Sequence, residues 1–175
     1  MKIFKKPNAP QALEILAKSR ERRENLSQLR PIVEEGEKLC VWCLDQIPPG
    51  CRKYCSTFCS ESAWAFFNPQ SKVGLRYLLV YQNFTCNKCG FDYKPFIEMI
   101  TGSEVTQKSM SESGYGIYGL SNLLRKEGYE DHVPEVDHIE AIALGGESLG
   151  FDNHQVLCKT CHKEKTADDM RSIRG

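Results

Sequence analysis

The spacing of apolar residues along the chain predicts several short amphipathic helices. The first covers residues 9–30, where Asn8 can cap the N-terminus and Pro31 ends the helix; its broken apolar stripe consists of Leu13, Ile15, Leu16, Leu26 and Leu29. Further helices are expected over residues 60–67, 71–84, 96–100 and 120–126. In the helix over 71–84, the side chains expected to be buried are those of Val73, Leu75, Leu78, Leu79 and Tyr81. The chain ahead of residue 134 is therefore predicted to hold helices joined by turns.

The pattern changes after residue 134. Residues 134–143 predict a strand centred on residues 135–139, and the glycines at 145–146 permit a tight turn with positive φ. A second short strand is expected after these glycines. Thr160 is a good N-cap for a final helix over residues 161–170. This order of strand, turn, strand and helix, together with the preceding helices, predicts an α+β fold.

Composition places the chain among soluble globular proteins. It has 175 residues, of which 26% are charged and 41% hydrophobic, and no apolar run approaches the roughly 20 residues of a membrane-spanning helix. The basic N-terminus lacks the apolar segment of a secretory signal peptide. Nine cysteines are many for this length, and their Cys-x-x-Cys spacing is typical of metal ligands rather than of disulfides. We therefore expect a reducing compartment, the cytoplasm, and no membrane association.

Eight of the cysteines fall into two sets, each with the spacing of a tetrahedral zinc site. The first set brackets a short hairpin, and the second consists of two Cys-x-x-Cys pairs far apart in the sequence. The first set is Cys40, Cys43, Cys55 and Cys59; the second is Cys86, Cys89, Cys158 and Cys161. Each set predicts a structural Zn²⁺ as cofactor. The ninth cysteine, Cys51, is interpreted as a non-ligand in an exposed turn. Its spacing to Cys55 is nevertheless the same as the spacing from Cys55 to Cys59, with three residues between the two cysteines.

Charge is balanced overall but is unevenly distributed. The formal net charge is +0, whereas a nucleic-acid-binding protein usually carries a basic excess. Residues 1–30 carry eight Lys and Arg against three Glu, and residues 103–140 carry eight Asp and Glu against three Lys and Arg. A DNA-binding surface would then be local, formed by the N-terminal segment and by the final helix with Lys159, Lys163 and Lys165.

Four residues of the C-terminal part have the chemistry of metal-assisted hydrolysis: Asp137, His138, Asn153 and His162. A carboxylate from Asp137 and an imidazole from His162 leave several positions open on a metal, which suits Mg²⁺, Mn²⁺ or another divalent ion. In a straight strand Asp137 and His138 point to opposite faces. We expect the twist at the strand end to let Asp137 reach the metal and His138 the water beside it. The remaining histidines lack such a motif, so packed or solvated rings are expected for His132 and His154.

The order Cys-x-x-Cys, Asp-His-Ile, Gly-Gly, Asn-x-Gln-x-Leu-Cys-x-x-Cys-His-x-x-Lys-Thr resembles the His-Asn-His (HNH) endonuclease family over residues 71–168. The resemblance implies a small ββα-metal core stapled by the second zinc, and hydrolysis of DNA phosphodiester bonds with a single metal ion. It implies that His138 is the general base and that Asp137 and His162 bind the catalytic metal. It further implies that Asn153 holds the loop that orients His138 or, as in some members of the family, ligates the metal.

The N-terminal part extends the resemblance. The first cysteine set, the Trp- and Phe-containing helix and the long insert are similar to the C-terminal nuclease module of vertebrate zinc-finger annealing helicases. No Walker-type phosphate loop is found in the sequence, so the resemblance does not imply ATP-coupled activity. The predicted organisation is a basic arm and helix (1–35), a zinc knuckle (36–70) and a nuclease domain (71–175) with an insert at 91–134.

These observations lead to one expected function and two alternatives. The expected function is that of a metal-dependent DNA endonuclease. A non-catalytic double-zinc module that binds nucleic acid or protein is the first alternative, and cleavage of RNA, which shares the same chemistry, is the second. One active site cuts one strand, so cleavage of a duplex would need a homodimer, a protein partner or two successive nicks.

Overall fold

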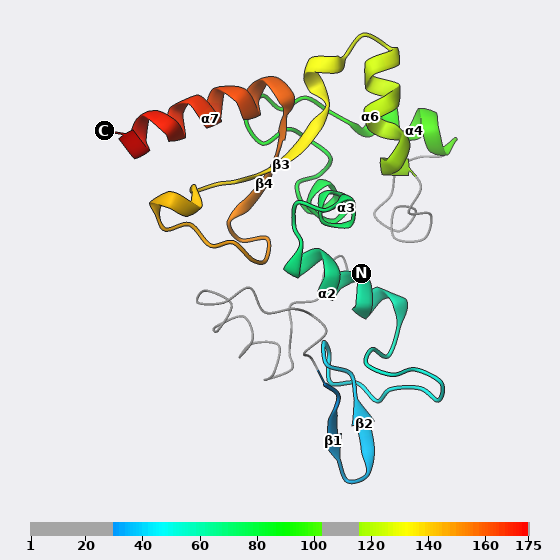
Figure 1. The fold of residues 1–175 in the computed structure, drawn as a ribbon. Coiled ribbons are helices and arrows are strands. Elements are labelled where there is room, and N and C mark those ends of the chain that lie inside the picture. Colours follow the sequence, from blue (N-terminus) through cyan, green and yellow to red (C-terminus); the bar gives the residue numbers. More distant parts are fainter. Residues whose placement is uncertain (1–29, 103–115, 175) are drawn as a thin grey trace.

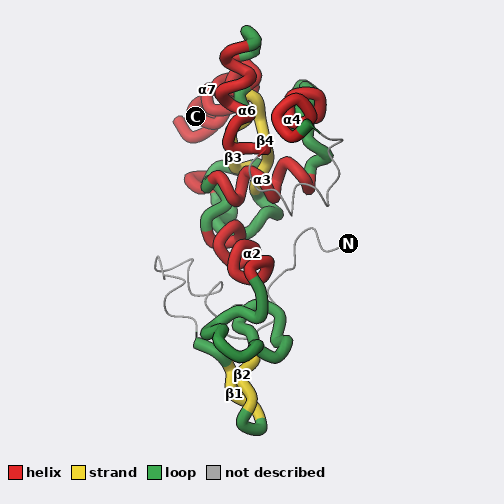
Figure 2. Tube along the Cα trace, turned by 90° about the vertical axis from the view of Figure 1, so that its right-hand side faces the viewer, coloured by secondary structure: helices red, strands yellow, loops and turns green. Residues whose placement is uncertain are grey.

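The computed structural model describes residues 30–102 and 116–174 (Figure 1). The helix predicted over residues 9–30 lies outside the described residues, apart from Arg30. The elements follow one another along one long direction. The hairpin of β1 and β2 lies at one end, α2 and α3 lie in the middle, and β3, β4, α4, α6 and α7 lie at the other end (Figures 1 and 2).

The first hairpin consists of β1 (Ile32–Glu34) and β2 (Glu37–Leu39), which pair antiparallel. Its tight turn takes positive φ at Glu35 and Gly36. The sequence pattern did not predict these strands, and they lead directly into Cys40. The cysteines of the first set then surround a small core of their own, which contains the fully buried Trp42.

Helix α2 (Thr57–Phe67) begins three residues earlier than the pattern predicted. The reason is Ser56, whose hydroxyl accepts a hydrogen bond from the backbone N–H of Cys59 (3.2 Å) and caps the helix. Cys59 therefore lies in the first turn of α2. The helix ends at Phe67, and the N–H of Asn68 bonds back to the carbonyl of Trp64 (2.9 Å).

Helix α3 (Lys72–Tyr81) is capped in the same way by Ser71. It ends at Tyr81 rather than near residue 84, because Asn83 and Phe84 have positive φ. The expected burial of Tyr81 is wrong, since its side chain is 65% exposed. The buried face includes Arg76 instead, whose guanidinium pairs with Glu61 of α2. Packing against α2 thus decides which face of α3 is buried.

The main core gathers α3, the β3–β4 hairpin and the two helices of the insert. Helices α4 (Lys94–Thr101) and α6 (Gly116–Lys126) form close to their predicted positions and pack on each other. The ring of Phe91 stacks on His132, with centroids 4.0 Å apart, so His132 is packed as expected. The fully buried side chains of this core include Leu78, Leu79, Tyr93, Ile97, Leu120, Leu124 and Val156.

Strands β3 (Pro134–His138) and β4 (His154–Cys158) form an antiparallel hairpin, and α7 (Lys159–Arg174) follows β4 without a gap. Two predicted details are wrong. The second strand does not follow the glycines at 145–146 directly, because a 3₁₀ turn (Ile142–Leu144) and a loop occupy residues 139–153. Thr160 is not the N-cap but lies inside α7, with its hydroxyl 3.4 Å from the carbonyl of Asp131.

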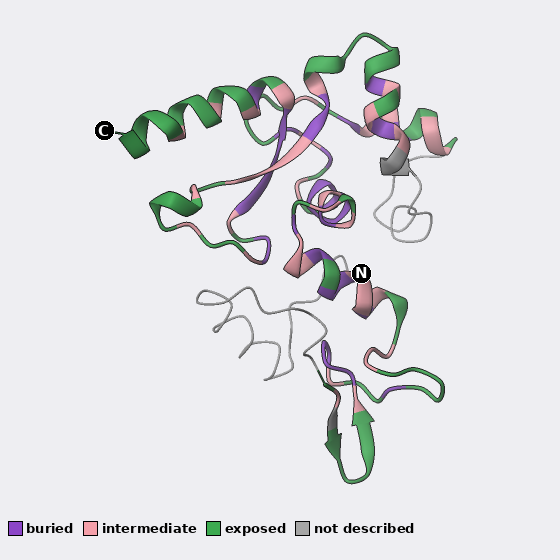
Figure 3. Cartoon of the chain, in the orientation of Figure 1, coloured by how far each residue is buried: buried purple, intermediate pink, exposed green. Residues whose placement is uncertain are grey.

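Burial differs sharply between the elements of this C-terminal part (Figure 3). Strand β4 is buried along its whole length, whereas Cys161 is the buried residue of α7. Strand β4 is therefore enclosed by the core, while α7 presents most of its surface to solvent. The predicted α+β class with two four-cysteine sets is confirmed. Within residues 30–102 and 116–174, no helix combines the length and apolarity that a bilayer crossing requires.

Candidate active site

The second cysteine set gathers at the junction of β4 and α7. Its four sulfur atoms, from Cys86, Cys89, Cys158 and Cys161, lie within 4.8 Å of one another. The sulfurs of Cys89 and Cys158 are 3.8 Å apart, close to the edge of about 3.8 Å that a tetrahedron has when sulfur lies about 2.3 Å from zinc. The nine cysteines are all free thiols. This set therefore fits one tetrahedral zinc ion, as predicted.

Backbone N–H groups stabilise the thiolate form of Cys86, which is the form that binds a metal. Its burial disfavours the thiolate, but surrounding backbone N–H groups, including those of Cys89 and Cys158, outweigh this effect and lower the pKa of Cys86 to about 7. The N–H of Cys158 lies 3.2 Å from this sulfur. The N–H of Asn87 bonds to the carbonyl of Val156 (2.8 Å) and ties the thiol turn to β4.

The first cysteine set forms a second cluster of the same kind, far from β4. Its sulfurs also lie within 4.8 Å of one another, with Cys43 and Cys55 at 3.4 Å and Cys55 and Cys59 at 3.6 Å. Cys51 is exposed and lies outside this cluster. The interpretation of Cys51 as a non-ligand therefore agrees with the geometry.

One face of β3 presents carboxylates to α7. Glu135 and Asp137 are two residues apart and so lie on the same face of the strand. His162, in the first turns of α7, lies between them: its Nδ1 is 2.6 Å from Glu135 Oε2, and its Nε2 is 3.7 Å from Asp137 Oδ1. With Nδ1 donating to Glu135, the lone pair of Nε2 is directed towards Asp137.

This face fits a divalent cation. A carboxylate oxygen and a neutral imidazole nitrogen are suitable ligands for Mg²⁺ or Mn²⁺. Asp137 Oδ2 is buried and accepts no hydrogen bond of normal geometry from the described residues. An unsatisfied buried carboxylate oxygen costs free energy unless a cation lies close by. The Lys165 ammonium, 3.4 Å from Oδ2, is such a cation, so it is the donor set of Asp137 and His162 that favours a metal here.

Lys165 lies beside the same carboxylate. Its ammonium is 3.4 Å from Asp137 Oδ2 and 2.6 Å from Asp169 Oδ2. Partial burial disfavours the charge, but these two carboxylates raise the pKa of Lys165 above its ordinary value. Its side chain is only 15% exposed, so Lys165 balances the acidic face, whereas Lys163 is exposed to solvent.

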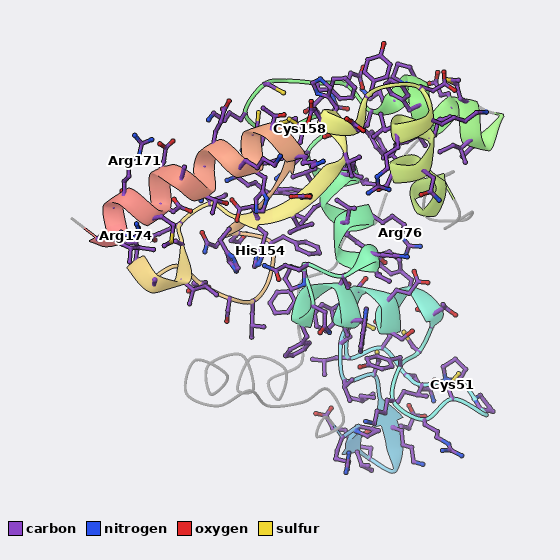
Figure 4. All side chains as sticks on the ribbon, turned by 45° about the horizontal axis from the view of Figure 1, so that its top comes forward. Cys51, Arg76, His154, Cys158, Arg171 and Arg174 are labelled. Atoms are coloured by element: carbon purple, nitrogen blue, oxygen red, sulfur yellow. The ribbon has the colours of Figure 1, made fainter. Side chains whose placement is uncertain are left out.

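His138 lies on the opposite face of β3, against His154. The two residues are direct partners in the strand register, and their ring centroids are 4.4 Å apart. Burial lowers the pKa of His138; the Asp137 carboxylate opposes this shift and Lys165 adds to it. In Figure 4, His154 lies on the side of the hairpin that faces α2, while Cys158 lies at the other end of β4, near the start of α7.

Asn153 fixes the loop between β3 and β4. Its Oδ1 accepts from the N–H of Glu140 (2.8 Å), and its Nδ2 donates to the carbonyls of Glu140 and Glu147, both at 2.9 Å. Gly146 permits this close approach, because a Cβ there would lie 2.0 Å from the carbonyl oxygen of Glu140 and 2.6 Å from Asn153 Nδ2. The Asn153 amide is thus committed to the backbone of the loop and does not point to the Asp137 face.

The structure brings Asp137 and His162 together as predicted, and it places His138 on the other face of the strand end. Two residues near the site were missed as candidates. Glu135 was detectable, because its spacing of two from Asp137 places both on one face of a strand. His154 was expected to be an ordinary packed ring; its contact with His138 depends on the β3–β4 register, which the sequence does not reveal.

Residues 128–168 match the family model described as HNH endonuclease. The chain is also similar to the protein named "DNA annealing helicase and endonuclease ZRANB3", with 28% identity over 160 residues in Mus musculus and 28% over 156 residues in Homo sapiens. These alignments cover 82% and 79% of this chain but 14% of each relative, so the chain spans about one seventh of their length. No solved structure shows a significant match. The predicted resemblance to the HNH endonucleases is thereby confirmed for the segment that carries β3, β4 and the first turns of α7.

Proposed function

We propose that this protein is a metal-dependent endonuclease that hydrolyses phosphodiester bonds of DNA. The observation that carries the proposal is the Asp137–His162 pair, whose Oδ1 and Nε2 face each other at 3.7 Å within the segment that matches the HNH endonucleases. The endonuclease activity stated in the names of the relatives supports the same reading. In this proposal residues 36–70 form a zinc knuckle, and residues 71–175 form the nuclease domain with its insert at 91–134.

Asp137 and His162 would hold a divalent ion such as Mg²⁺ or Mn²⁺. When bound, such an ion supplies positive charge that stabilises the phosphate and the departing 3′ oxygen. Glu135 keeps the His162 ring in the orientation that directs Nε2 to Asp137. Asp137 lies in β3, which pairs with the buried strand β4, and its side chain is 16% exposed, so its carboxylate is held in place.

His138 is the proposed general base. Its lowered pKa keeps the imidazole neutral near pH 7, so a ring nitrogen can take a proton from the attacking water. His138 is the last residue of β3, and Asp137 precedes it on the other face. A DNA backbone that passes over the C-terminal end of β3 would contact the face with Asp137 and then the imidazole of His138. Asn153 holds the loop after His138 and so keeps the ring in position.

Lys163, on the exposed side of α7, is the proposed contact to a nucleic-acid substrate. Lys163 is exposed and lies next to His162, where it could contact a phosphate of the bound strand. Lys165, which was predicted to bind phosphate directly, would instead act by neutralising Asp137 and Asp169. A single site cuts a single strand, so a second copy or a partner protein would be needed for a duplex break.

One observation favours the alternative of a non-catalytic zinc module. The Lys165 ammonium already stands 3.4 Å from Asp137 Oδ2, where it balances part of the charge that a metal would balance. In that case the acidic face would be a structural ion-pair network, and the cysteine clusters would present a binding surface.

A plasmid-nicking time course separates these functions. The purified protein is incubated with supercoiled plasmid in EDTA and then with Mg²⁺ or Mn²⁺, beside His138→Ala protein of matched zinc content. We expect metal-dependent nicking by the wild type and a loss of about 100-fold or more in His138→Ala. Lysine-to-methionine substitution at Lys163 should weaken DNA binding without this loss of rate. An absence of nicking with every metal, while the protein still binds DNA, would support the zinc-module alternative.

A further inference from the structure

A pocket of about 360 Å³ opens on the His138 face of β3. It lies between α2, the turn that leads into α3, and the loop after β3. The residues that matter for its chemistry are Trp64, Phe67, Gln70, His138, Ser148 and His154. A volume above about 300 Å³ is in the range of small-ligand pockets. The pocket therefore has α2, the helix of the zinc knuckle, on one side and His138, the proposed general base, on the other.

The lining is aromatic and polar but carries no formal charge. Among the described residues, no Lys, Arg, Asp or Glu lines the pocket. Such a lining does not suit a phosphate, which is bound by cationic side chains. It suits a flat heteroaromatic group that has polar atoms at its edge.

The side chain of Trp64 is exposed to solvent, which is unusual for so large an apolar side chain. It is 48% exposed, whereas the other tryptophan, Trp42, is fully buried and packs edge-on against Phe66 with centroids 5.5 Å apart. Its neighbours Ala63 and Ala65 on α2 are fully buried. The indole of Trp64 is thus presented at the wall of the pocket, and not in the core.

His154 closes the inner wall of the pocket beside His138. It is 2% exposed, and neither of its ring nitrogens makes a hydrogen bond of normal geometry with a described residue. Because both nitrogens are enclosed, His154 contributes a closed part of the pocket wall rather than a hydrogen-bonding group for a ligand.

We infer that this pocket binds an unpaired nucleobase of the strand that is cut, stacked on Trp64 with its edge directed to the exposed polar side chains of Gln70 and Ser148. The inference rests on the proposed function, because the occupant is identified through its position beside His138. If the phosphate that is cut lies at the C-terminal end of β3, the next nucleotide of the same DNA strand lies on the side of the hairpin where the pocket opens. A base that stacks on an indole has left its own stack, so the nucleotide next to the cut would be unpaired.

Tryptophan fluorescence tests this inference without any cleavage. The zinc-loaded protein is titrated, without added Mg²⁺ or Mn²⁺, with a thymidine oligonucleotide, with an abasic oligonucleotide of equal length, and with the thymidine strand paired to its complement. We expect the thymidine strand to quench the exposed Trp64, and the abasic strand and the duplex to quench it much less. In Trp64→Phe protein the remaining Trp42 is buried, so the quenching should disappear.

Binding measured by anisotropy of a labelled strand gives the second readout. Trp64→Ala should weaken binding of the thymidine strand by about tenfold and leave binding of the abasic strand unchanged. The matched control is Tyr81→Ala, which removes an exposed aromatic side chain outside the pocket lining. Equal affinity of wild type and Trp64→Ala for thymidine strands, or equal quenching by the abasic strand, would overturn the inference, and the occupant would then be sought among protein segments.

The inference and the proposed function can fail separately. Base-dependent quenching by a protein that nicks no plasmid would support the pocket and contradict the nuclease. Metal-dependent nicking by a protein whose fluorescence ignores the bases would support the nuclease and contradict the pocket.

Discussion

The two cysteine clusters have the same four thiols but different places in the fold. The first draws its ligands from residues 40–59 and closes on a small core of its own around Trp42. The second joins segments that are 72 residues apart, where the N–H of Cys158 donates to the sulfur of Cys86. Three of its cysteines, Cys86, Cys158 and Cys161, belong to the main core. The first cluster therefore stabilises a local unit, and the second holds together segments that are far apart in the sequence.

The difference matters because the candidate site lies next to the second cluster. Cys161 is followed directly by His162, and Cys158 is the last residue of β4. Among the described residues, helix α2 connects the first cluster to the site, with Cys59 in its first turn and Trp64 and Phe67 in its C-terminal half. We therefore assign the geometry of the metal face to the second cluster and the shape of the pocket to the first.

The largest effect is expected for Cys158→Ser. Structural zinc contributes on the order of 10–16 kcal/mol to the folding of small zinc domains, so its loss should unfold the β3–β4 hairpin and abolish nicking. Zinc content and thermal melting followed by circular dichroism measure this effect. Cys51→Ser, which removes an exposed thiol outside both clusters, is the control and should behave as wild type. A Cys158→Ser protein that melts like wild type would remove the distinction between the clusters.

A different outcome is expected for Cys43→Ser. The protein should lose the zinc of the first cluster and keep that of the second, because the two do not share a ligand. Nicking at saturating DNA should largely persist, while the DNA concentration for half-maximal rate rises by about tenfold, as for a lost stacking contact. If the rate at saturating DNA falls as far as in Cys158→Ser, the two clusters act on the site in the same way.

Local sequence patterns predicted much of the fold. Helical spacing located α3, α4 and α6 within a few residues, since an amphipathic stripe is a local property. Thiol spacing predicted both clusters for the same reason. The β1–β2 hairpin was missed because strands of three residues show too little alternation to detect.

The remaining features depend on contacts between distant segments. The exposure of Tyr81 follows from the packing of α3 on α2, where Arg76 pairs with Glu61. The contact of His154 with His138 follows from the register of β3 and β4. No pattern within either segment contains this information.

The loop between β3 and β4 is held by Asn153 rather than by zinc, and Gly146→Ala tests that difference. The new Cβ would lie 2.0 Å from the backbone oxygen of Glu140, so the loop must shift. We expect a loss of about 1–3 kcal/mol in the free energy of unfolding, with slower nicking and unchanged zinc content. Gly119→Ala is the control, because its Cβ would meet the Ile100 side chain at an ordinary 3.4 Å. Equal stability of both variants would contradict the tight fit at Gly146.

The smallest expected effect is the pH dependence of the free energy of unfolding that His154 causes. Burial, with the neighbouring His138 ring adding to it, lowers the pKa of His154 to about 4, against roughly 6.5 in an unfolded chain. Between these values the unfolded state binds more protons, so the stability that is fully present above pH 6.5 is lost as pH falls towards 4. At pH 5.5 the loss is on the order of 1 kcal/mol relative to pH 8.

Urea unfolding at both pH values, with zinc retention checked, should show this loss in wild type and lack it in His154→Gln. The comparison of the two proteins removes the contribution of the cysteine clusters, which both contain. The same pH dependence in both proteins would mean that His154 is not held neutral by the fold.

The central claim is that Asp137 and His162 form a divalent-cation site separate from both cysteine clusters. Electron paramagnetic resonance of Mn²⁺, titrated into zinc-loaded protein, tests it most directly. We predict that the wild type and His138→Ala bind Mn²⁺ alike, and that Asp137→Asn weakens binding by about tenfold or more. Unchanged Mn²⁺ affinity in Asp137→Asn, at matched zinc content, would contradict the claim.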